Sequence, residues 1–231
     1  MIHIKSLFSY AVALAALFFI WAAPAQAQIP TQDQILAGLS ARYRTLDTLQ
    51  ADYRRVASTP STDQIFRSGS SQSATGVLCW QRPDRLLLNQ GAPTREIMVT
   101  DGSTVWWYLA EEKLAYRYRD IDVANQLRPL MSFLSGLDSL NADFNVAPAP
   151  AEASRSGQYG LSLTPKKGMD GGVDMITIWC DSVYTLTGFR LHSVTGETTD
   201  FHLSNFSENP KFEKNIFNFK PPRGTEILEE G

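Results

Sequence analysis

Hydrophobic and polar residues change their spacing several times along the chain, and each spacing predicts a different kind of element. Apolar residues fill positions 7–23 almost without interruption, after a polar start that carries Lys5. Small residues follow in Ala25-Gln26-Ala27. A positive start, an apolar middle and a small-residue end are typical of a cleavable secretory signal. We therefore expect residues 1–27 to be removed by cleavage near Ala27, and residues 28–231 to form one domain with its own core.

The next segment repeats apolar residues every three or four positions, which is the spacing of one face of a helix. Thr31 precedes Gln34 by three residues, the spacing of a capping box at a helix start. We expect an N-terminal amphipathic helix, followed over residues 58–74 by a polar loop or by two strand ends joined by one. The apolar stripe consists of Ile35, Leu39, Tyr43, Leu46 and Leu49.

From Gly76 onward the spacing changes to two, the period of a strand with two different faces. Runs of this kind recur about every ten residues, which predicts about ten strands in a mainly β, antiparallel meander that curls into a barrel or half-barrel. The expected strands are 76–82, 85–88, 97–100, 104–108, 114–119, 144–146, 159–163, 174–180, 186–194 and 198–206.

Asp101-Gly102 lies between two apolar runs, which is a strong hairpin signal. A two-residue turn would pair Val99 with Thr104 and Ile97 with Trp106. Both faces of this hairpin are apolar, so we expect it to be covered on both sides, and the pattern leaves open which face lines a cavity. One face would carry Ile97, Val99, Trp106 and Tyr108, and the other Met98, Val105 and Trp107.

Residues 120–139 interrupt the strands with a region that is nearly all apolar in its second half. Asp122 can cap one short helix, Pro129 suits the first turn of another, and Gly136 is a plausible stop. The region is too short to span a membrane, so we expect a pair of short helices lying on an apolar surface. Its apolar residues are Leu130, Met131, Phe133, Leu134 and Leu137.

The charge balance argues against a nucleic-acid partner. The formal net charge is −3, and loss of Lys5 with the signal makes the mature chain more acidic. A mildly acidic chain without a basic run is a poor binder of phosphate backbones. The chain also lacks the polybasic patch that would hold it on an anionic membrane.

No motif for catalysis, a cofactor or a metal is visible in the sequence. A two-residue turn at Thr195-Gly196 would direct His192 and His202 to opposite faces of a hairpin, where they could not share a metal. We therefore expect neither a metal nor a cofactor, and no enzyme. Cys79 and Cys180 can either form a disulfide in an oxidising compartment or stay as two small buried residues.

Several short motifs, in a fixed order, resemble those of the LolA family of outer-membrane lipoprotein carriers. Each motif is short, and their order and spacing over the whole mature chain make the resemblance specific. They are Gly76 to Pro83 (GVLCWQRP), Ile97 to Tyr108 (IMVTDGSTVWWY), Pro129 to Gly136 (PLMSFLSG), Leu163 to Lys166 (LTPK), Thr195-Gly196 with the polar residues after it, Asn205, and Phe217 to Pro222 (FNFKPP).

The resemblance implies an unclosed antiparallel barrel whose cavity is covered by helices that act as a lid. It also implies a soluble periplasmic carrier that acts as a monomer. Such a carrier accepts the acyl chains of triacylated lipoproteins from an inner-membrane ABC transporter and delivers them to the outer-membrane receptor LolB or an equivalent. Arg82 matches the family's arginine before proline, which holds the lid closed until a ligand arrives; from the residues alone, it could be a strand-end arginine that reaches solvent.

The resemblance also suggests the residues of an acyl-chain cavity, although each of them could equally be ordinary core. Leu86 and Leu88 are aliphatic where the family usually carries aromatic residues, so the shape of the cavity and its ligand preference remain open. The candidates for the wall are Leu78, Trp80, Leu86, Leu88, Ile97, Val99 and Trp106, and those for the lid are Met131, Phe133, Leu134 and Leu137.

Other functions fit the same pattern. The fold could carry or sense another lipid, such as a glycolipid or a phospholipid. The chain could also be a periplasmic adaptor that binds another protein, which would not distinguish lipidated from delipidated partners. A secreted hydrolase would instead lose turnover when a single Ser or Asp is changed.

Overall fold

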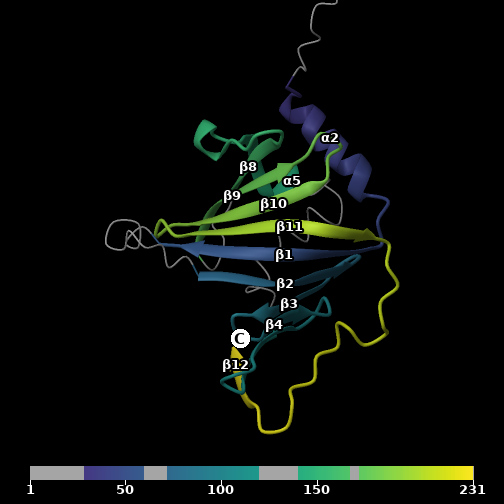
Figure 1. Ribbon diagram of the computed structural model, residues 1–231, viewed down its shortest axis with the longest axis vertical. Helices are drawn as coiled ribbons and strands as arrows, with labels where there is room; N and C mark the ends of the chain where they lie inside the picture. The colour runs from purple at the N-terminus through teal and green to yellow at the C-terminus, as the bar shows by residue number, and fades with distance from the viewer. Residues whose placement is uncertain (1–28, 60–71, 120–139, 167–171, 231) are drawn as a thin grey trace, which may run out of the picture.

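One open, strongly twisted sheet dominates the computed structural model, which describes residues 29–59, 72–119, 140–166 and 172–230 (Figure 1). The elements are α2 (Gln32–Tyr43), β1 (Thr48–Ser58), β2 (Gln72–Gln81), β3 (Arg85–Ala92), β4 (Glu96–Thr100), β5 (Val105–Leu109), β6 (Leu114–Tyr118), α5 (Leu140–Asp143), β7 (Phe144–Pro148), a 3-10 turn (Ala151–Ala153), β8 (Tyr159–Pro165), β9 (Val173–Cys180), β10 (Leu186–Ser193), β11 (Thr198–Glu208) and β12 (Glu226–Glu230).

The twelve strands lie in the order β12-β6-β5-β4-β3-β2-β1-β11-β10-β9-β8-β7. Neighbouring strands are antiparallel except β12, which pairs in parallel with β6. β1 joins the two halves because it pairs with β2 on one side and β11 on the other. β12 and β7 form the two edges and do not pair with each other, so the sheet is unclosed. This confirms the expected mainly β, open architecture.

The N-terminal helix begins as its sequence predicts and ends sooner. Thr31 accepts a hydrogen bond from the backbone of Gln34, and the Gln34 side chain accepts one from the backbone of Thr31, so the capping box is complete. The helix ends at Tyr43. Leu49 therefore belongs to β1, where apolar residues recur every second position. The expected helical stripe ran across this boundary because Leu46 and Leu49 happen to keep a three-residue spacing.

The sheet has two apolar faces, and each packs against a different part of the chain. We call the inner face the one that carries Leu78 and Trp80, and it packs against α2 through Ile35 and Leu39. We call the outer face the opposite one, which carries Cys79 and other residues of β2–β5. Because successive residues of a strand point to opposite sides, register decides to which face each side chain belongs.

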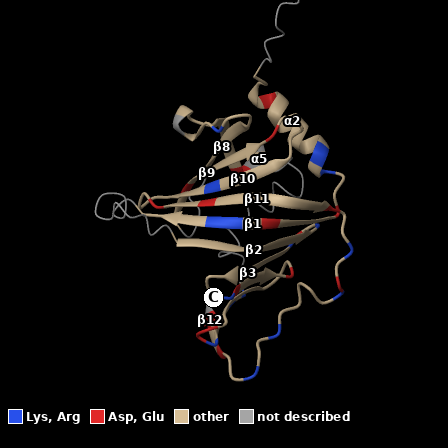
Figure 2. Ribbon diagram, viewed as in Figure 1, with Lys and Arg blue, Asp and Glu red and all other residues tan. Residues whose placement is uncertain are grey.

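The C-terminal segment, residues 209–225, covers part of the outer face. It runs from the end of β11 along one side of the sheet to β12 (Figure 1). Phe217 is only 4% exposed and packs with Cys79, Leu87 and Val99. Several residues along the same segment are Lys or Arg (Figure 2). The segment therefore acts as a strap that closes the outer core.

The β4–β5 hairpin has a longer turn than its sequence predicts. Thr100 pairs with Val105 and Val99 pairs with Trp106, so four residues form the loop. The Asp101 carboxylate accepts hydrogen bonds from the backbone N–H groups of Ser103 and Thr104, and these bonds stabilise the longer loop. The expected pairing was wrong by two positions. A shift of two preserves the faces, so Ile97, Val99, Trp106 and Tyr108 share one face as expected.

The β10–β11 turn differs by one residue, and this shift changes the faces. Ser193 donates its backbone N–H to Glu197 at 2.9 Å, which leaves a three-residue loop with Gly196 at φ 86°. A positive φ in the last position is typical of such loops and favours glycine. His192 then pairs with Thr198, and His202 with Gly188. Both histidines lie on the outer face, so the expectation of opposite faces was wrong.

Candidate functional site

Four of the predicted wall residues lie together on the inner face. Leu78 pairs with Leu88, and Trp80 pairs with Leu86, across β2 and β3. All four are buried, and Trp80 is fully inaccessible. They belong to the same core cluster as the apolar side of α2. The structure therefore brings these four residues together on the face that a ligand between sheet and helix would contact.

The three remaining wall candidates lie on the outer face. Val99 pairs with Leu87 on one side and Trp106 on the other, and Ile97 lies two residues before Val99 on the same side of β4. All three pack in the cluster that contains Phe217. Their placement beside Leu78 and Trp80 was therefore wrong. Both faces of the hairpin are apolar, and the strap that covers one of them comes from residues more than a hundred positions later in the chain.

The hairpin instead presents Met98 and Trp107 to the inner face, because Met98 pairs with Leu88 and with Trp107. Trp107 stacks on Tyr116 with ring centroids 5.3 Å apart, and Tyr116 stacks on Tyr118 at 6.4 Å. All four of these residues are half-buried. They continue the apolar surface of Leu86 and Leu88 toward the sheet edge at β6 and β12.

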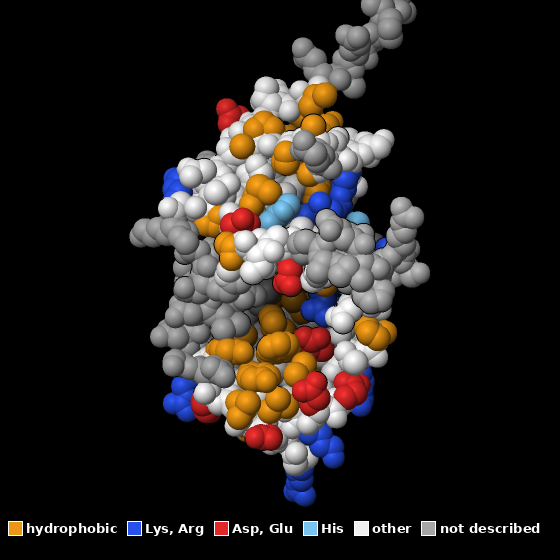
Figure 3. Space-filling view, turned by 90° about the vertical axis from the view of Figure 1, so that its left-hand side faces the viewer, with side chains coloured by type: hydrophobic (Ala, Val, Ile, Leu, Met, Phe, Trp, Pro, Cys, Tyr) orange, Lys and Arg blue, Asp and Glu red, His pale blue; other side chains and the backbone are white. Residues whose placement is uncertain are grey.

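Figure 3 shows the side of the molecule that lies away from the C-terminal strap. Hydrophobic side chains gather in the lower half of this side. A contiguous patch of exposed apolar side chains is a candidate for a binding surface, whereas a single one is not. The sequence showed that Met98 and Trp107 share a face, but nothing in it distinguished that face as the inner one. We define the acyl-face candidates as Leu86, Leu88, Met98, Trp107, Tyr116 and Tyr118.

Arg82 caps the C-terminal end of α2 by hydrogen bonding to backbone carbonyls. Its Nε donates to the carbonyl of Leu46 at 3.1 Å, and Nη2 donates to the carbonyls of Leu46 at 3.0 Å and Tyr43 at 3.2 Å. The last carbonyls of a helix have no partner within the helix, and a cation there also complements the helix dipole. The guanidinium lies over the Trp80 ring at 5.4 Å from its centroid. Arg82 thus connects the inner-face strand β2 with the chain turn that follows α2.

Several predicted features lie outside the described residues. These are the signal segment 1–27 and the lid candidates Met131, Phe133, Leu134 and Leu137. The expected contact between Arg82 and a lid also involves residues outside the described ones. Arg82 has a further interaction besides the hydrogen bonds named above.

Both cysteines are free thiols in the structure. Cys79 lies on the outer face and Cys180 packs in the inner core, so they are on opposite sides of the sheet. Burial raises the pKa of Cys79 to about 11, and burial together with the charge of Asp181 raises that of Cys180 to about 12. The sequence left open whether the two cysteines form a disulfide or are small buried residues, and in the structure they are buried and unpaired.

The described segments offer no grouping of three His, Cys, Asp or Glu side chains that could hold a metal ion. His192 and His202 share the outer face, but Arg190 and Asp200 form an ion pair between them at 2.8 Å. Burial and nearby arginines lower the pKa of both histidines. None of the helices in the described segments is long and apolar enough to cross a bilayer.

One known protein family matches most of the chain. The sequence model of the family described as "Outer membrane lipoprotein carrier protein LolA" matches residues 44–220. The chain belongs to the LolA family. The match begins at the turn after α2, spans β1 to β11, and ends within the C-terminal strap.

Curated relatives of this LolA family member carry the same family name at modest identity. The chain is similar to the "Outer-membrane lipoprotein carrier protein" of Methylococcus capsulatus, with 26% identity over 96% of this chain and 98% of the relative. It is also similar to proteins of that name from Albidiferax ferrireducens, at 24% identity over 84% of this chain and 91% of the relative, and from Legionella pneumophila, at 26% over 83% and 88%.

A solved structure shares the fold of this LolA family member. It is an uncharacterized conserved protein from Thermus thermophilus, which matches with a TM-score of 0.50 at 8% identity, over 86% of this chain and 98% of that one. At this identity the similarity concerns the fold alone.

Proposed function

We propose that the chain is a periplasmic carrier that accepts the acyl chains of lipoproteins released from the inner membrane and delivers them to an outer-membrane receptor. One observation carries the proposal. The inner face of an open sheet, in a member of the LolA family, continues from a buried core into half-buried aromatic residues and Met98. A flexible apolar ligand can extend the core over these residues.

The energetics of the cargo explain why such a carrier is needed. A triacylated anchor contains on the order of 40 methylene groups, and at ~0.8 kcal/mol each their exposure to water costs roughly 30 kcal/mol. Free diffusion across an aqueous compartment cannot compete with that cost. The carrier must offer a comparable apolar surface and later release it. This task requires no bond making or breaking, which supports a role without catalysis.

The binding surface combines residues that adapt with residues that stack. Met98 is unbranched and polarizable, which suits contact with flexible chains. The rings of Trp107 and Tyr116 provide large flat surfaces with little conformational freedom to lose. An acyl chain that lies along these rings would cover apolar area now left half-buried. Leu86 and Leu88 would form the floor of the same surface.

The direction of transport must come from the partners, because the sequence has no nucleotide-binding motif. The family resemblance supports an inner-membrane ABC transporter as the donor and LolB or an equivalent receptor as the acceptor. The names of the relatives support lipoproteins as the cargo. Met131, Phe133, Leu134 and Leu137 are proposed to cover the bound chains, with Arg82 as the group that holds this cover closed.

Displacement of a fluorescent apolar dye tests the proposal. The chain without residues 1–27 is loaded with the dye and titrated with a triacylated lipopeptide, or with its delipidated twin. We expect displacement by the acylated peptide alone, because the acyl chains provide the driving force. Equal displacement by both peptides would support a protein-binding adaptor, and no displacement by either would contradict carriage of lipid anchors.

A further inference from the structure

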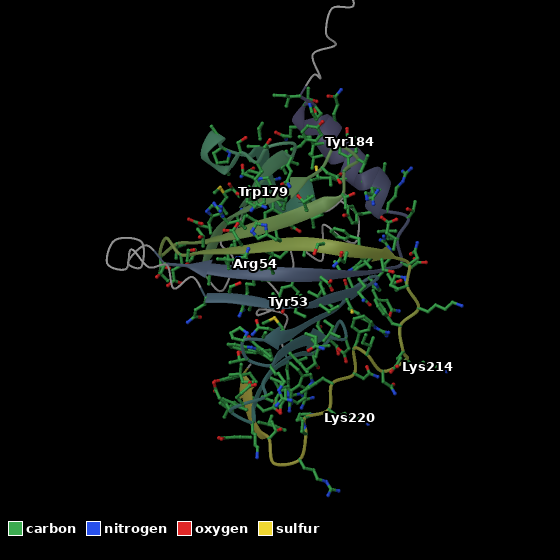
Figure 4. All side chains as sticks on the ribbon, viewed as in Figure 1. Tyr53, Arg54, Trp179, Tyr184, Lys214 and Lys220 are labelled. Atoms are coloured by element: carbon green, nitrogen blue, oxygen red, sulfur yellow. The ribbon has the colours of Figure 1, made fainter. Side chains whose placement is uncertain are left out.

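An arginine interrupts the apolar inner face near one end of β1. Arg55 pairs with Ala74 of β2 and with Phe201 of β11, and both partners are buried on the inner side. The neighbour Arg54 points the opposite way, because it pairs with His202 on the outer face. Tyr53 and Arg54 are labelled on β1 in Figure 4. Arg55 is therefore the charged residue that β1 presents to the apolar side of the sheet.

Small residues on β2 leave room for the Arg55 side chain to lie across the inner face of neighbouring strands. Ala74 and Gly76 lie opposite Arg55 and Tyr53. A Cβ atom at Gly76 would come within 2.7 Å of the Tyr53 ring, so only glycine allows the ring to lie over β2. The Arg55 guanidinium reaches past β2 and β3 to Glu96 on β4, at 3.5 Å.

Glu96 is held firmly by other groups. Its Oε1 accepts a hydrogen bond from the Trp107 indole at 2.6 Å, and its Oε2 accepts one from the Gln90 amide at 3.1 Å. Gln90 is only 3% exposed, and it is itself fixed by a bond to the Thr94 carbonyl at 3.0 Å. The Glu96 side chain is 16% exposed. The carboxylate is thus a rigid anchor beside Trp107, one of the acyl-face candidates.

The Arg55 guanidinium has more N–H donors than its contact with Glu96 uses. A guanidinium carries five N–H groups, and Glu96 at 3.5 Å is the one ion-pair partner that Arg55 has in the described part of the chain. The Arg55 side chain remains 35% exposed. Unused donors beside an apolar surface favour a ligand that offers oxygen acceptors next to its hydrocarbon.

The charge of the pair indicates which acceptor fits. Arg55 and Glu96 together are neutral, so they provide hydrogen-bond donors without a net positive charge. A phosphate group would face the nearby Glu96 carboxylate, whereas an ester or amide carbonyl would not be repelled. We propose that Arg55, oriented by Glu96, binds the ester and amide carbonyl oxygens of a lipid anchor. This inference rests on the proposed function and specifies how the polar part of the cargo is recognised.

Ester and ether lipopeptides of equal chain length test this inference. The ether form has the same hydrocarbon but lacks the two ester carbonyls. In the dye-displacement assay, wild-type protein is expected to bind the ester form about tenfold more tightly, and Arg55→Met should lower this ratio to about one. Arg54→Met, the adjacent outer-face change, should keep the wild-type ratio. A ratio near one in wild type, or a ratio preserved in Arg55→Met, would overturn the inference.

A gain-of-function variant keeps the test independent of misfolding. Glu96→Gln retains an acceptor for Trp107 but removes the negative charge, so Arg55 becomes an unbalanced cation. Dispersed phosphatidylglycerol with the same acyl chains should then bind several-fold more tightly than it binds to wild type. Unchanged affinity would overturn the charge argument. If neither the ester nor the ether lipopeptide displaces the dye, the proposed carriage fails as well, whereas equal displacement by both contradicts only the role of Arg55.

Discussion

At the scale of single residues, Arg82 donates hydrogen bonds to several backbone carbonyls from one side chain. It lies on the inner-face side of β2 and satisfies carbonyls at and just after the end of α2. Three acceptors on one guanidinium are geometrically specific, because the planar fork can donate in several directions at once. The position therefore depends on the shape of the arginine side chain as well as on its charge.

Replacement of Arg82 by leucine should leave these carbonyls without their donor. We expect the free energy of unfolding to fall by about 2 kcal/mol, the usual loss for a hydrogen bond to a charged group. Urea denaturation measures the change. Arg82→Lys should lose less, because its ammonium still complements the helix dipole. If both variants unfold at the same urea concentration as wild type, Arg82 does not stabilise the end of the helix.

At the scale of elements, the C-terminal strap covers the outer apolar face of β4 and β5. Phe217 packs on Cys79, Leu87 and Val99, and Phe219 contacts the rings of Trp106 and Tyr108. Without the strap, both faces of β4 and β5 would expose apolar residues to water. The strap therefore buries one apolar face of β4 and β5, and under the proposed function the opposite face is the one that binds the acyl chains.

Phe217→Ala should destabilise the strap strongly. Loss of a buried phenylalanine ring costs about 3 kcal/mol, which a shift of the urea midpoint reports. Asn218→Ala is the matched control, because Asn218 is exposed and should change stability by less than about 0.5 kcal/mol. Equal effects of the two changes would show that the strap is not anchored by Phe217.

Local patterns predicted strands β2 to β11 but missed β1 and β12, and they misplaced the end of α2 and the lengths of two turns. The capping box of Thr31 and Gln34 was visible in sequence because its partners are three residues apart. The end of α2 was not, since Leu49 fits both a helical stripe and a strand. Loop length was equally ambiguous: Asp101 and Gly196 both marked turns correctly, but the number of loop residues depends on local hydrogen bonds.

At the scale of the whole molecule, one open sheet carries a hydrophobic core cluster on each of its two faces. β1 joins two halves of a twelve-stranded sheet whose edge strands, β12 and β7, do not pair with each other. The sequence predicted this architecture and the apolar character of both faces. It could not predict which face is inner, because α2 and the strap, which lie at opposite ends of the chain, decide that together. Trp106 was therefore grouped with Leu78 and Trp80, although it is Trp107 that shares their face.

The pair of adjacent tryptophans on β5 can report directly whether acyl chains lie on the inner face. A triacylated lipopeptide with brominated acyl chains quenches the fluorescence of indoles in contact with them. We expect strong quenching in wild type, little change in Trp106→Phe, and loss of a substantial part of the quenching in Trp107→Phe. If the quenching depends on Trp106 instead, or on neither residue, the acyl chains do not lie on this part of the inner face and the proposed mode of carriage is contradicted.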